Sequence, residues 1–365
     1  MKQVIKNFKI NGDVISVERY GEGHINETYL AVVNENGVEV NYILQKINNK
    51  LFTNVEKLMN NIMLVTEYNR KKIIERGGNP DRESLSLVYT NDNKPYYYCK
   101  ETDSYFRVYI FITDAVAHQK VTNPDQFYQS AVAFGEFANL LAEFDATQLF
   151  EVLPNFHNTV TRFENFTKSL NLDKLSRASS VKEEIDFVLN RKDYCNRIVD
   201  LLASGEMPTK VTHNDTKLNN VMLDVNTNVP VAVIDLDTIM PGSICYDFGD
   251  SIRFGCNTGA EDEKDLTKVN FDIDLFEYYT KGYLKSLGNT VTVAEKDNLA
   301  FGAILMTFEC GMRFLTDYLD GDVYFRTHRE GHNLDRARTQ FKLVKDMEAR
   351  LDEMNAIVNK YYMQI

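Results

Sequence analysis

Stretches rich in β-branched, aromatic and other apolar residues, separated by glycine- and asparagine-containing turns, recur along the N-terminal part of the chain, as in β-strands. Strands are predicted at residues 14–20, 28–33, 38–46, 85–89, 96–100 and 107–112. The turn Asn34-Glu35-Asn36-Gly37 joins two of them as a hairpin. Between the third and fourth strands, a helix is predicted from Asn54, a good N-cap, to the stop signal at Gly77.

Past residue 112 the apolar positions follow helical spacing instead. A helix opens at Asn123-Pro124, and others are predicted at 181–203, 272–287, 293–320 and 334–363. A β-rich segment at 210–237 interrupts them. The pattern predicts an α+β fold with a small antiparallel β lobe, residues 1–111, before a large helical lobe, residues 112–365.

Composition narrows the class of protein. The chain has 365 residues, of which 44% are hydrophobic and 26% charged, as is ordinary for a globular protein. Its net charge of −12 disfavours nucleic acid and anionic membranes as partners. We see no apolar run of membrane-spanning length and no secretory signal, so we expect a cytoplasmic protein. The five cysteines form no Cys-x-x-Cys pair and are expected to be reduced thiols.

The sharpest motif lies in the β-rich segment. It reads His213-x-Asp215-x-Lys217-x-x-Asn220, then a hairpin, then a short apolar strand that ends in Asp235. Enzymes with the protein-kinase fold carry their catalytic loop and their metal-binding aspartate in this order. The motif therefore predicts phosphoryl transfer from Mg·ATP, whereas the plainer alternative is a surface loop rich in Asx turns.

Phosphoryl transfer explains why these residue types are needed. Asp215 would orient the attacking hydroxyl and accept its proton late, since an ordinary aspartate, with a pKa of about 3.9, is a weak base. Lys217 would neutralise the γ-phosphate. Asn220 and Asp235 offer the hard oxygen ligands that Mg²⁺ prefers. His213 is expected to hold the loop by hydrogen bonds.

Two further motifs accompany this loop. Gly21-x-Gly23 between strands suits a hairpin whose backbone N–H groups cover phosphates, and its alternative is an ordinary glycine turn. The motif is not a dinucleotide-binding fingerprint, because Asn26 stands where that fingerprint needs its third glycine. Downstream, a Pro-Gly turn precedes Asp247, which we expect to cap a helix and brace the catalytic loop.

Together these motifs resemble those of the aminoglycoside phosphotransferase and choline kinase superfamily. Within it, longer strings resemble the bacterial N-acetylhexosamine 1-kinases from about residue 14 to 360: GEGHINETY, THNDTKLNN, IDLDTIMPGS, DFGDSIRFG and ECGMRFL. The resemblance implies a protein-kinase-like two-lobed fold. It also implies that the γ-phosphoryl of Mg·ATP moves to the anomeric hydroxyl of N-acetylglucosamine or N-acetylgalactosamine.

The resemblance also implies roles for individual residues. Asp215 would be the catalytic base, and Asn220 and Asp235 would be the Mg·ATP ligands. The adenine would lie against a hinge that includes Tyr109, Phe111 and Ile112. The sugar would contact His24, Asp215, Phe254, Arg313 and Tyr324. From spacing alone, Glu309, Arg313 and Asp317 share one face of an apolar helix, so they form either a salt-bridge ladder or part of a site.

One position departs from the kinase pattern. Gln45 stands where the third strand should carry a lysine, and Lys46 would point to the opposite face of that strand. Glu56 and Glu67 are candidates for the glutamate that pairs with such a lysine in kinases.

The remaining histidines suggest no chemistry. His328 and His332 could share a metal on a helix, but Arg329 stands where a metalloprotease motif needs glutamate, so we expect no metal there. His118 and His157 are expected at the surface.

Two other functions stay open. The chain could phosphorylate another small alcohol, such as an aminoglycoside, choline or a different sugar. It could also be an inactive domain that only binds ATP. The retention of all three residues of the predicted Mg·ATP site favours an enzyme. The oligomeric state is not predicted.

Overall fold

The computed structural model describes residues 1–21, 25–121 and 123–365. Gly23 and His24, both predicted site residues, lie outside the described residues. The chain forms two compact units. The first comprises Met1–Ala117, Glu143–Leu153 and Val221–Met240, and the second comprises His118–Ala142, Pro154–Asn220 and Pro241–Ile365. The predicted lobe boundary at residue 111 stays a prediction.

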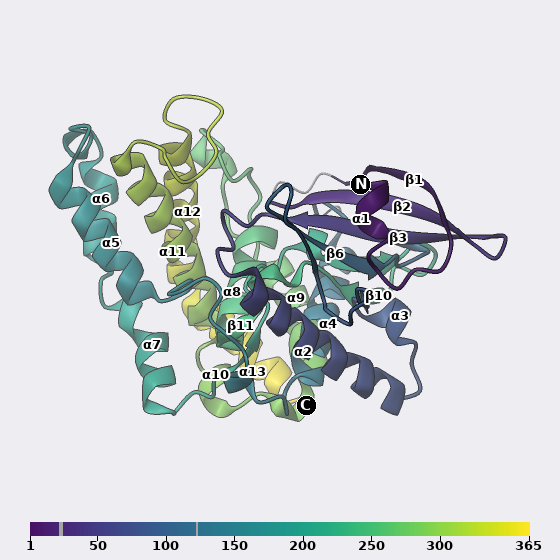
Figure 1. Ribbon diagram of the computed structural model, residues 1–365. Helices are drawn as coiled ribbons and strands as arrows, with labels where there is room; N and C mark the ends of the chain where they lie inside the picture. Colours follow the sequence, from purple (N-terminus) through teal and green to yellow (C-terminus); the bar gives the residue numbers. More distant parts are fainter. Residues whose placement is uncertain (22–24, 122) are drawn as a thin grey trace. The chain divides into compact units, whose positions relative to one another are not determined.

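An antiparallel sheet forms much of the first unit (Figure 1). Its spatial order is β1 (Asp13–Arg19), β2 (Glu27–Glu35), β3 (Val38–Ile47), β6 (Ser104–Ile110) and β4 (Leu87–Val88), and β5 (Tyr97–Cys99) also pairs with β6. Asn36 and Gly37 form the β2–β3 turn with φ of 56° and 89°, as the Asn-Gly dipeptide predicts. The predicted strands and this hairpin are therefore present.

The two faces of this sheet differ. Leu44 and Val108 are fully buried on one face, where Phe8 packs beside the short helix α1 (Lys2–Ile5). Gln45 and Arg107 lie one residue along the same strands and therefore project to the opposite face. Two polar side chains of β3 and β6 thus lie on that second face.

Helix α2 (Val55–Glu75) contacts the second face. Asn54 caps it by accepting the N–H of Lys57 at 2.9 Å, as predicted. The Met59 sulfur lies 3.9 Å from Nη1 of Arg107, which places α2 over the sheet. The unit also contains α3 (Pro80–Glu83), η1 (Ala146–Gln148), η4 (Leu236–Thr238) and a second antiparallel sheet of β10 (Pro230–Val233), β9 (Val221–Asp224) and β7 (Ala115–Val116).

The second unit is mainly helical. Its helices are α4 (Pro124–Leu140), α5 (Thr159–Leu172), α6 (Lys182–Leu189), α7 (Tyr194–Ser204), α8 (Ile244–Gly255), α9 (Ile273–Leu287), α10 (Val293–Lys296), α11 (Leu299–Asp320), α12 (His332–Ala349) and α13 (Leu351–Tyr362). Short 3₁₀ turns are η2 (Ala178–Ser180), η3 (Leu218–Asn220), η5 (Leu266–Lys268) and η6 (Gly288–Thr290). Strand β8 (Lys210–Thr212) pairs with β11 (Met240–Gly242).

Helix α11 forms the centre of this unit and packs against α5, α8 and α12 (Figure 1). The α8–α11 contact needs glycine, because a Cβ at Gly249 would lie 2.3 Å from the carbonyl oxygen of Gly302. This close approach fixes α8, the helix that braces the predicted catalytic loop.

Three predicted long helices are each divided in the structure. The segment 181–203 becomes α6 and α7, 293–320 becomes α10 and α11, and 334–363 becomes α12 and α13. In the first and third cases both halves bury apolar residues, so the helical spacing continues across the turn that separates them. The short helix α10 is different, because Glu295 is its buried residue and Val293 is exposed. Helix α5 had no counterpart among the predicted helices.

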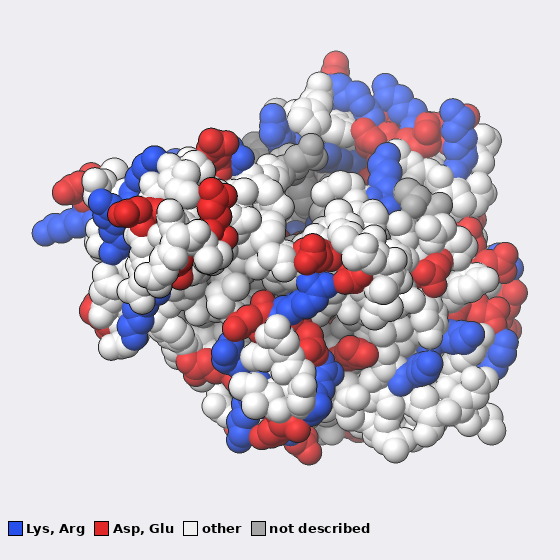
Figure 2. Space-filling model, turned by 90° about the vertical axis from the view of Figure 1, so that its right-hand side faces the viewer, with Lys and Arg blue, Asp and Glu red and all other residues white. Residues whose placement is uncertain are grey.

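Helix α11 is the exception to the expected lack of long apolar runs. By length and composition it could cross a membrane, but 83% of its most apolar window is buried within the fold. Figure 2 shows Lys and Arg interspersed with Asp and Glu over one face of the protein. Among the described residues drawn there, the excess acidic charge is not gathered in one patch.

Candidate active site

The predicted catalytic loop follows β8 in the second unit and is held by α8. The Asp247 carboxylate accepts the backbone N–H groups of His213 at 2.8 Å and Asn214 at 2.7 Å. Asp250 accepts the N–H of Thr216 at 3.1 Å. Burial raises the pKa of Asp247, although His213 and the two N–H bonds oppose that shift. The helix is capped by Ser243, so Asp247 braces the loop and does not cap the helix.

Asp215 lies in this loop with its side chain 25% exposed. Lys217 Nζ is 2.6 Å from one carboxylate oxygen, and Asn220 Nδ2 is 3.2 Å from the other. Asn220 also donates to the Asp215 carbonyl oxygen at 2.8 Å, which ties the η3 turn back onto the loop. Three predicted site residues of the second unit are thus in direct contact.

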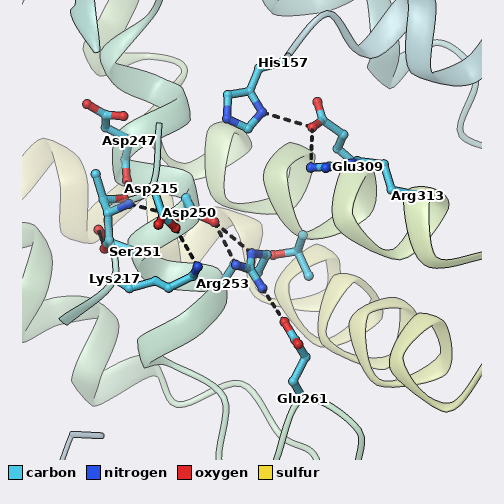
Figure 3. A network of polar contacts seen from close by, with 12 residues as sticks. His157, Asp215, Lys217, Asp247, Asp250, Ser251, Arg253, Glu261, Glu309 and Arg313 are labelled. Carbon is cyan, nitrogen blue, oxygen red and sulfur yellow. Dashed lines mark hydrogen bonds and ion pairs between the residues drawn. The ribbon is translucent and has the colours of Figure 1, made fainter. Parts of the chain in front are cut away.

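Figure 3 shows a buried polar network beside this contact. Arg253 Nη2 lies 2.9 Å from Asp250, and its Nη1 lies 3.1 Å from Glu261. Arg253 and Lys217 outweigh burial and lower the pKa of Asp250. Burial alone would lower the pKa of Lys217, but Asp215 and Asp250 outweigh it and raise that pKa. Lys217 is therefore a stable cation in this loop.

The predicted metal ligand Asp235 lies in the first unit, directly after β10. It is exposed and adopts a left-handed backbone conformation with φ of 61° and ψ of 64°. Two residues on, Asp237 is buried, where Asn26 and Arg107 donate to its two carboxylate oxygens. Arg107 also donates through Nε to Gln45 Oε1 at 2.9 Å. The first unit thus presents an exposed carboxylate above a buried polar cluster.

The predicted adenine hinge lies at the end of β6 in the same unit. Tyr109 and Ile112 are buried, and the Phe111 ring packs edge-on against Tyr20 with centroids 5.9 Å apart. Gly21 follows Tyr20 with a φ of 72°, a conformation that suits glycine. The Tyr109 hydroxyl is buried without a hydrogen-bond partner, and burial raises its pKa.

Arg313 lies on α11 among aromatic rings. Its guanidinium lies 5.5 Å from the ring centre of Phe156, 6.0 Å from that of Tyr324 and 5.6 Å from that of Phe325. Glu309, one turn earlier, is 3.9 Å from Arg313 and 3.0 Å from Nδ1 of His157 (Figure 3). The surface prediction for His157 is wrong, since its side chain is only 8% exposed and pairs with Glu309.

Tyr324 lies in the loop after α11, and Asp317 holds that loop. The Asp317 carboxylate accepts the backbone N–H groups of Val323, Tyr324 and Phe325 at 2.8–2.9 Å. Arg313 and Tyr324 both line a cavity of about 410 Å³. The residues that line it include neither Asp215 nor the half-buried Phe254, which lies on α8.

The histidine pair has a structural explanation. His332 Nε2 lies 2.9 Å from Asp262, and His332 Nδ1 accepts the N–H of His328. Among the described residues, no three His, Cys, Asp or Glu side chains form a metal-binding group. A magnesium ion could still bind, because it commonly takes one or two protein ligands and completes its shell with phosphate and water.

Several polar residues next to the predicted site residues gave no clear signal in the sequence. They are Asn26, Arg107, His157, Asp237, Asp250 and Arg253. Arg107 offered the best clue, because an arginine within an apolar strand must find a partner when it is buried. The identity of that partner depends on tertiary contacts that spacing does not show.

The comparison with known families identifies the class of protein. The family described as APH, phosphotransferase enzyme family, matches residues 77–281. That stretch is more than half of the chain, so the chain belongs to this family.

Solved structures of three kinases share the fold. A microcompartment-associated aminopropanol kinase matches with a TM-score of 0.59 and 13% identity over 97% of each chain. An aminoglycoside phosphotransferase from Alicyclobacillus acidocaldarius matches with a TM-score of 0.59 and 13% identity over 99% of this chain and 96% of that chain. A choline kinase from Cryptosporidium parvum matches with a TM-score of 0.57 and 12% identity over 99% of this chain and 98% of the kinase chain. The predicted α+β, kinase-like fold is confirmed by these structures, and the predicted phosphotransferase family is confirmed by the family match.

Proposed function

We propose that the protein transfers the γ-phosphoryl group of Mg·ATP to the anomeric hydroxyl of N-acetylglucosamine or N-acetylgalactosamine. The observation that carries the proposal is Asp215, whose partly exposed carboxylate is held between Lys217 and Asn220 on a loop braced by α8. A carboxylate fixed in this way can align a hydroxyl and take its proton, which is what the loose transition state of phosphoryl transfer requires.

We assign the magnesium ion to Asn220 and Asp235, whose side chains offer the oxygen ligands that it prefers. The amide nitrogen of Asn220 is engaged by Asp215, which leaves the Asn220 side-chain oxygen as a ligand atom, and Asp235 adds an exposed carboxylate. Bound magnesium would neutralise charge on the phosphates. Lys217 adds a second positive charge in the same loop, for the γ-phosphate.

The other nucleotide contacts belong to the first unit. We assign the phosphates to the turn at Gly21 and Gly23, and the adenine to Tyr109, Phe111 and Ile112. The burial of Tyr109 and Ile112 supports an apolar hinge. In this proposal residues 1–111 form the nucleotide-binding lobe and residues 112–365 form the catalytic and substrate-binding lobe.

The acceptor site comprises His24, Asp215, Phe254, Arg313 and Tyr324. The cavity that Arg313 and Tyr324 share supports the assignment of these two residues, because a sugar amide needs polar partners and its methyl group needs an apolar wall. The strings that resemble the N-acetylhexosamine 1-kinases support the choice of sugar over other small alcohols. The five free cysteines support a cytoplasmic location.

A panel of acceptors tests the proposal. ADP release with Mg·ATP is measured for both N-acetylhexosamines, choline, kanamycin, ethanolamine and 1-amino-2-propanol, and phosphorus NMR identifies the product. We expect N-acetylhexosamine to be the best acceptor, with phosphate on C1. A better rate with one of the amines, or phosphate on C6, would overturn the choice of acceptor. No ADP release with any acceptor would favour a domain that only binds nucleotide.

A further inference from the structure

The cation that kinases place on the third strand has a counterpart here on the neighbouring strand. Gln45 occupies the lysine position on β3, and its side chain is already engaged. Its Nε2 donates to Thr28 Oγ1 at 3.0 Å, and its Oε1 accepts Nε of Arg107 at 2.9 Å. Gln45 therefore orients the guanidinium of Arg107 and, as an uncharged side chain, does not supply the positive charge of the missing lysine.

Arg107 lies directly opposite Gln45 on β6. Directly opposed residues of antiparallel strands project to the same face of a sheet, so the guanidinium occupies the face and level where the lysine is missing. The Arg107 side chain is only 2% exposed. A buried guanidinium needs a fixed anionic partner, and the structure provides one.

That partner differs from the kinase pattern. In protein kinases the strand lysine pairs with a glutamate of the first helix. Here Glu56 is exposed, and Glu67 accepts the hydroxyl of Tyr89. Helix α2 instead faces Arg107 with the sulfur of Met59. The carboxylate that pairs with Arg107 is Asp237, in the turn after β10.

Asp237 connects Arg107 to the predicted metal ligand. It lies two residues after Asp235, which a left-handed backbone places at the protein surface. Both oxygens of Asp237 are engaged, one by Arg107 and the other by Asn26. Asn26 is itself fixed, because its side-chain oxygen accepts the N–H of Asn48 at 3.0 Å. The turn that presents Asp235 is thus anchored to β6 through Arg107 and, through Asn26, to the residue before β2 and the residue after β3.

We propose that Arg107 stands in for the missing strand lysine as a positioning residue, which fixes the Asp235 turn through Asp237 for the metal of Mg·ATP. The proposal rests on the proposed phosphotransferase function. Since Asp237 neutralises the guanidinium, Arg107 acts on the metal ligand and not directly on phosphate. Loss of Arg107 should therefore weaken the metal-dependent part of nucleotide binding and leave the metal-independent part intact.

The test uses paired substitutions, because Arg107→Met alone would leave Asp237 buried and unpaired. Arg107→Met/Asp237→Asn removes both charges together. Isothermal titration calorimetry then measures ADP binding with excess Mg²⁺ and again with EDTA. We expect affinity for Mg·ADP to fall by about 10- to 100-fold, the usual loss when a group that orients a metal ligand is removed. Affinity for ADP in EDTA should stay at the wild-type value.

A second variant returns the cation to β3. Gln45→Lys/Arg107→Gln exchanges the two positions and keeps a positive charge opposite Asp237. It should bind Mg·ADP more tightly than the neutral double variant. Lys46→Met is the matched control, since this lysine is on the same strand, projects to the opposite face and pairs with Glu27. The control should bind Mg·ADP like the wild type.

Three results would overturn the inference. Wild-type Mg·ADP affinity in the neutral double variant would make Arg107 a purely structural residue. An equal loss with Mg²⁺ and with EDTA would mean that Arg107 acts on the nucleotide or on the whole fold. Equal weakness of the exchanged and neutral variants would show that a cation on this face is not what positions the turn. Failure of the proposed function is distinct, because it would appear in the wild type, as a lack of ADP release with the acceptor panel, and not in the nucleotide affinities of the variants.

Discussion

Asp247→Asn should separate the stability of the catalytic loop from its chemistry. The carboxylate accepts two backbone N–H groups, from His213 at 2.8 Å and Asn214 at 2.7 Å. An amide of the same shape has one oxygen, so one buried N–H loses its partner and faces the new NH₂ group. A buried donor left without a partner costs about 1–3 kcal/mol. Because burial raises the pKa of Asp247, removal of the charge returns part of this cost, and we expect a net loss near the lower end.

The same substitution should also reduce kcat. Asp215 follows the two anchored residues directly, so a shift of the loop displaces its carboxylate. A misplacement of about 1 Å can cost about 100-fold in rate, and we expect kcat to fall by roughly 10- to 100-fold with little change in KM for ATP.

Urea denaturation and steady-state kinetics measure the two effects on one preparation. Asp200→Asn, on the exposed side of α7, is the matched control and should change neither quantity. A variant with wild-type kcat, or one more stable than the wild type, would refute the idea that Asp247 holds the loop in its working geometry.

Three further predictions concern other contacts of the second unit. His157 and Arg313 lower the pKa of Glu309 against the effect of burial. The ionised Glu309 therefore stabilises the fold above its unfolded pKa, near 4.5, and this stabilisation is lost as pH falls through the lower folded pKa. Glu309→Gln should reduce the loss of unfolding free energy between pH 7 and pH 3, measured by denaturation. Asp317→Asn should loosen the Tyr324 loop and raise KM for the sugar while KM for ATP stays constant. Lys217→Met should lower kcat at every pH from 6 to 9, because the raised pKa of this lysine keeps it charged throughout that range.

The sequence predicted helix starts and the hairpin turn correctly, because these features depend on residues close together in the chain. Asn54 and Asn123 cap α2 and α4 as expected, because a cap needs only its own side chain and the next turn. Asn36-Gly37 set the hairpin turn by the same logic. The order of Asp215, Asn220 and the later Asp235 indicated the enzyme class, since chain order is visible in a sequence.

The sequence did not predict the partners of buried polar side chains when those partners come from a distant part of the chain. Gln45 looked like a missing cation, because nothing in the sequence shows that Arg107, on another strand, lies directly opposite. His157 looked like a surface residue, because its partner Glu309 lies on α11, far along the chain. Both cases concern buried charge, whose placement is decided by tertiary contacts.

Helix boundaries failed for a related reason. Apolar spacing continues from α12 to α13, since both helices bury one face, and the break at Arg350 is visible only in its backbone angles, φ of −117° and ψ of 13°. The pattern therefore reports burial correctly and misses the change of direction.

In the proposed reaction, Asp215 accepts the proton of the attacking hydroxyl next to Mg·ATP. The direct measurement compares wild type and Asp215→Asn, with kcat for N-acetylglucosamine phosphorylation from ADP release and Mg·ADP affinity from calorimetry. We expect kcat to fall by about 100- to 10,000-fold, the usual contribution of a general base, while nucleotide affinity is retained. A variant that turns over at the wild-type rate would contradict it.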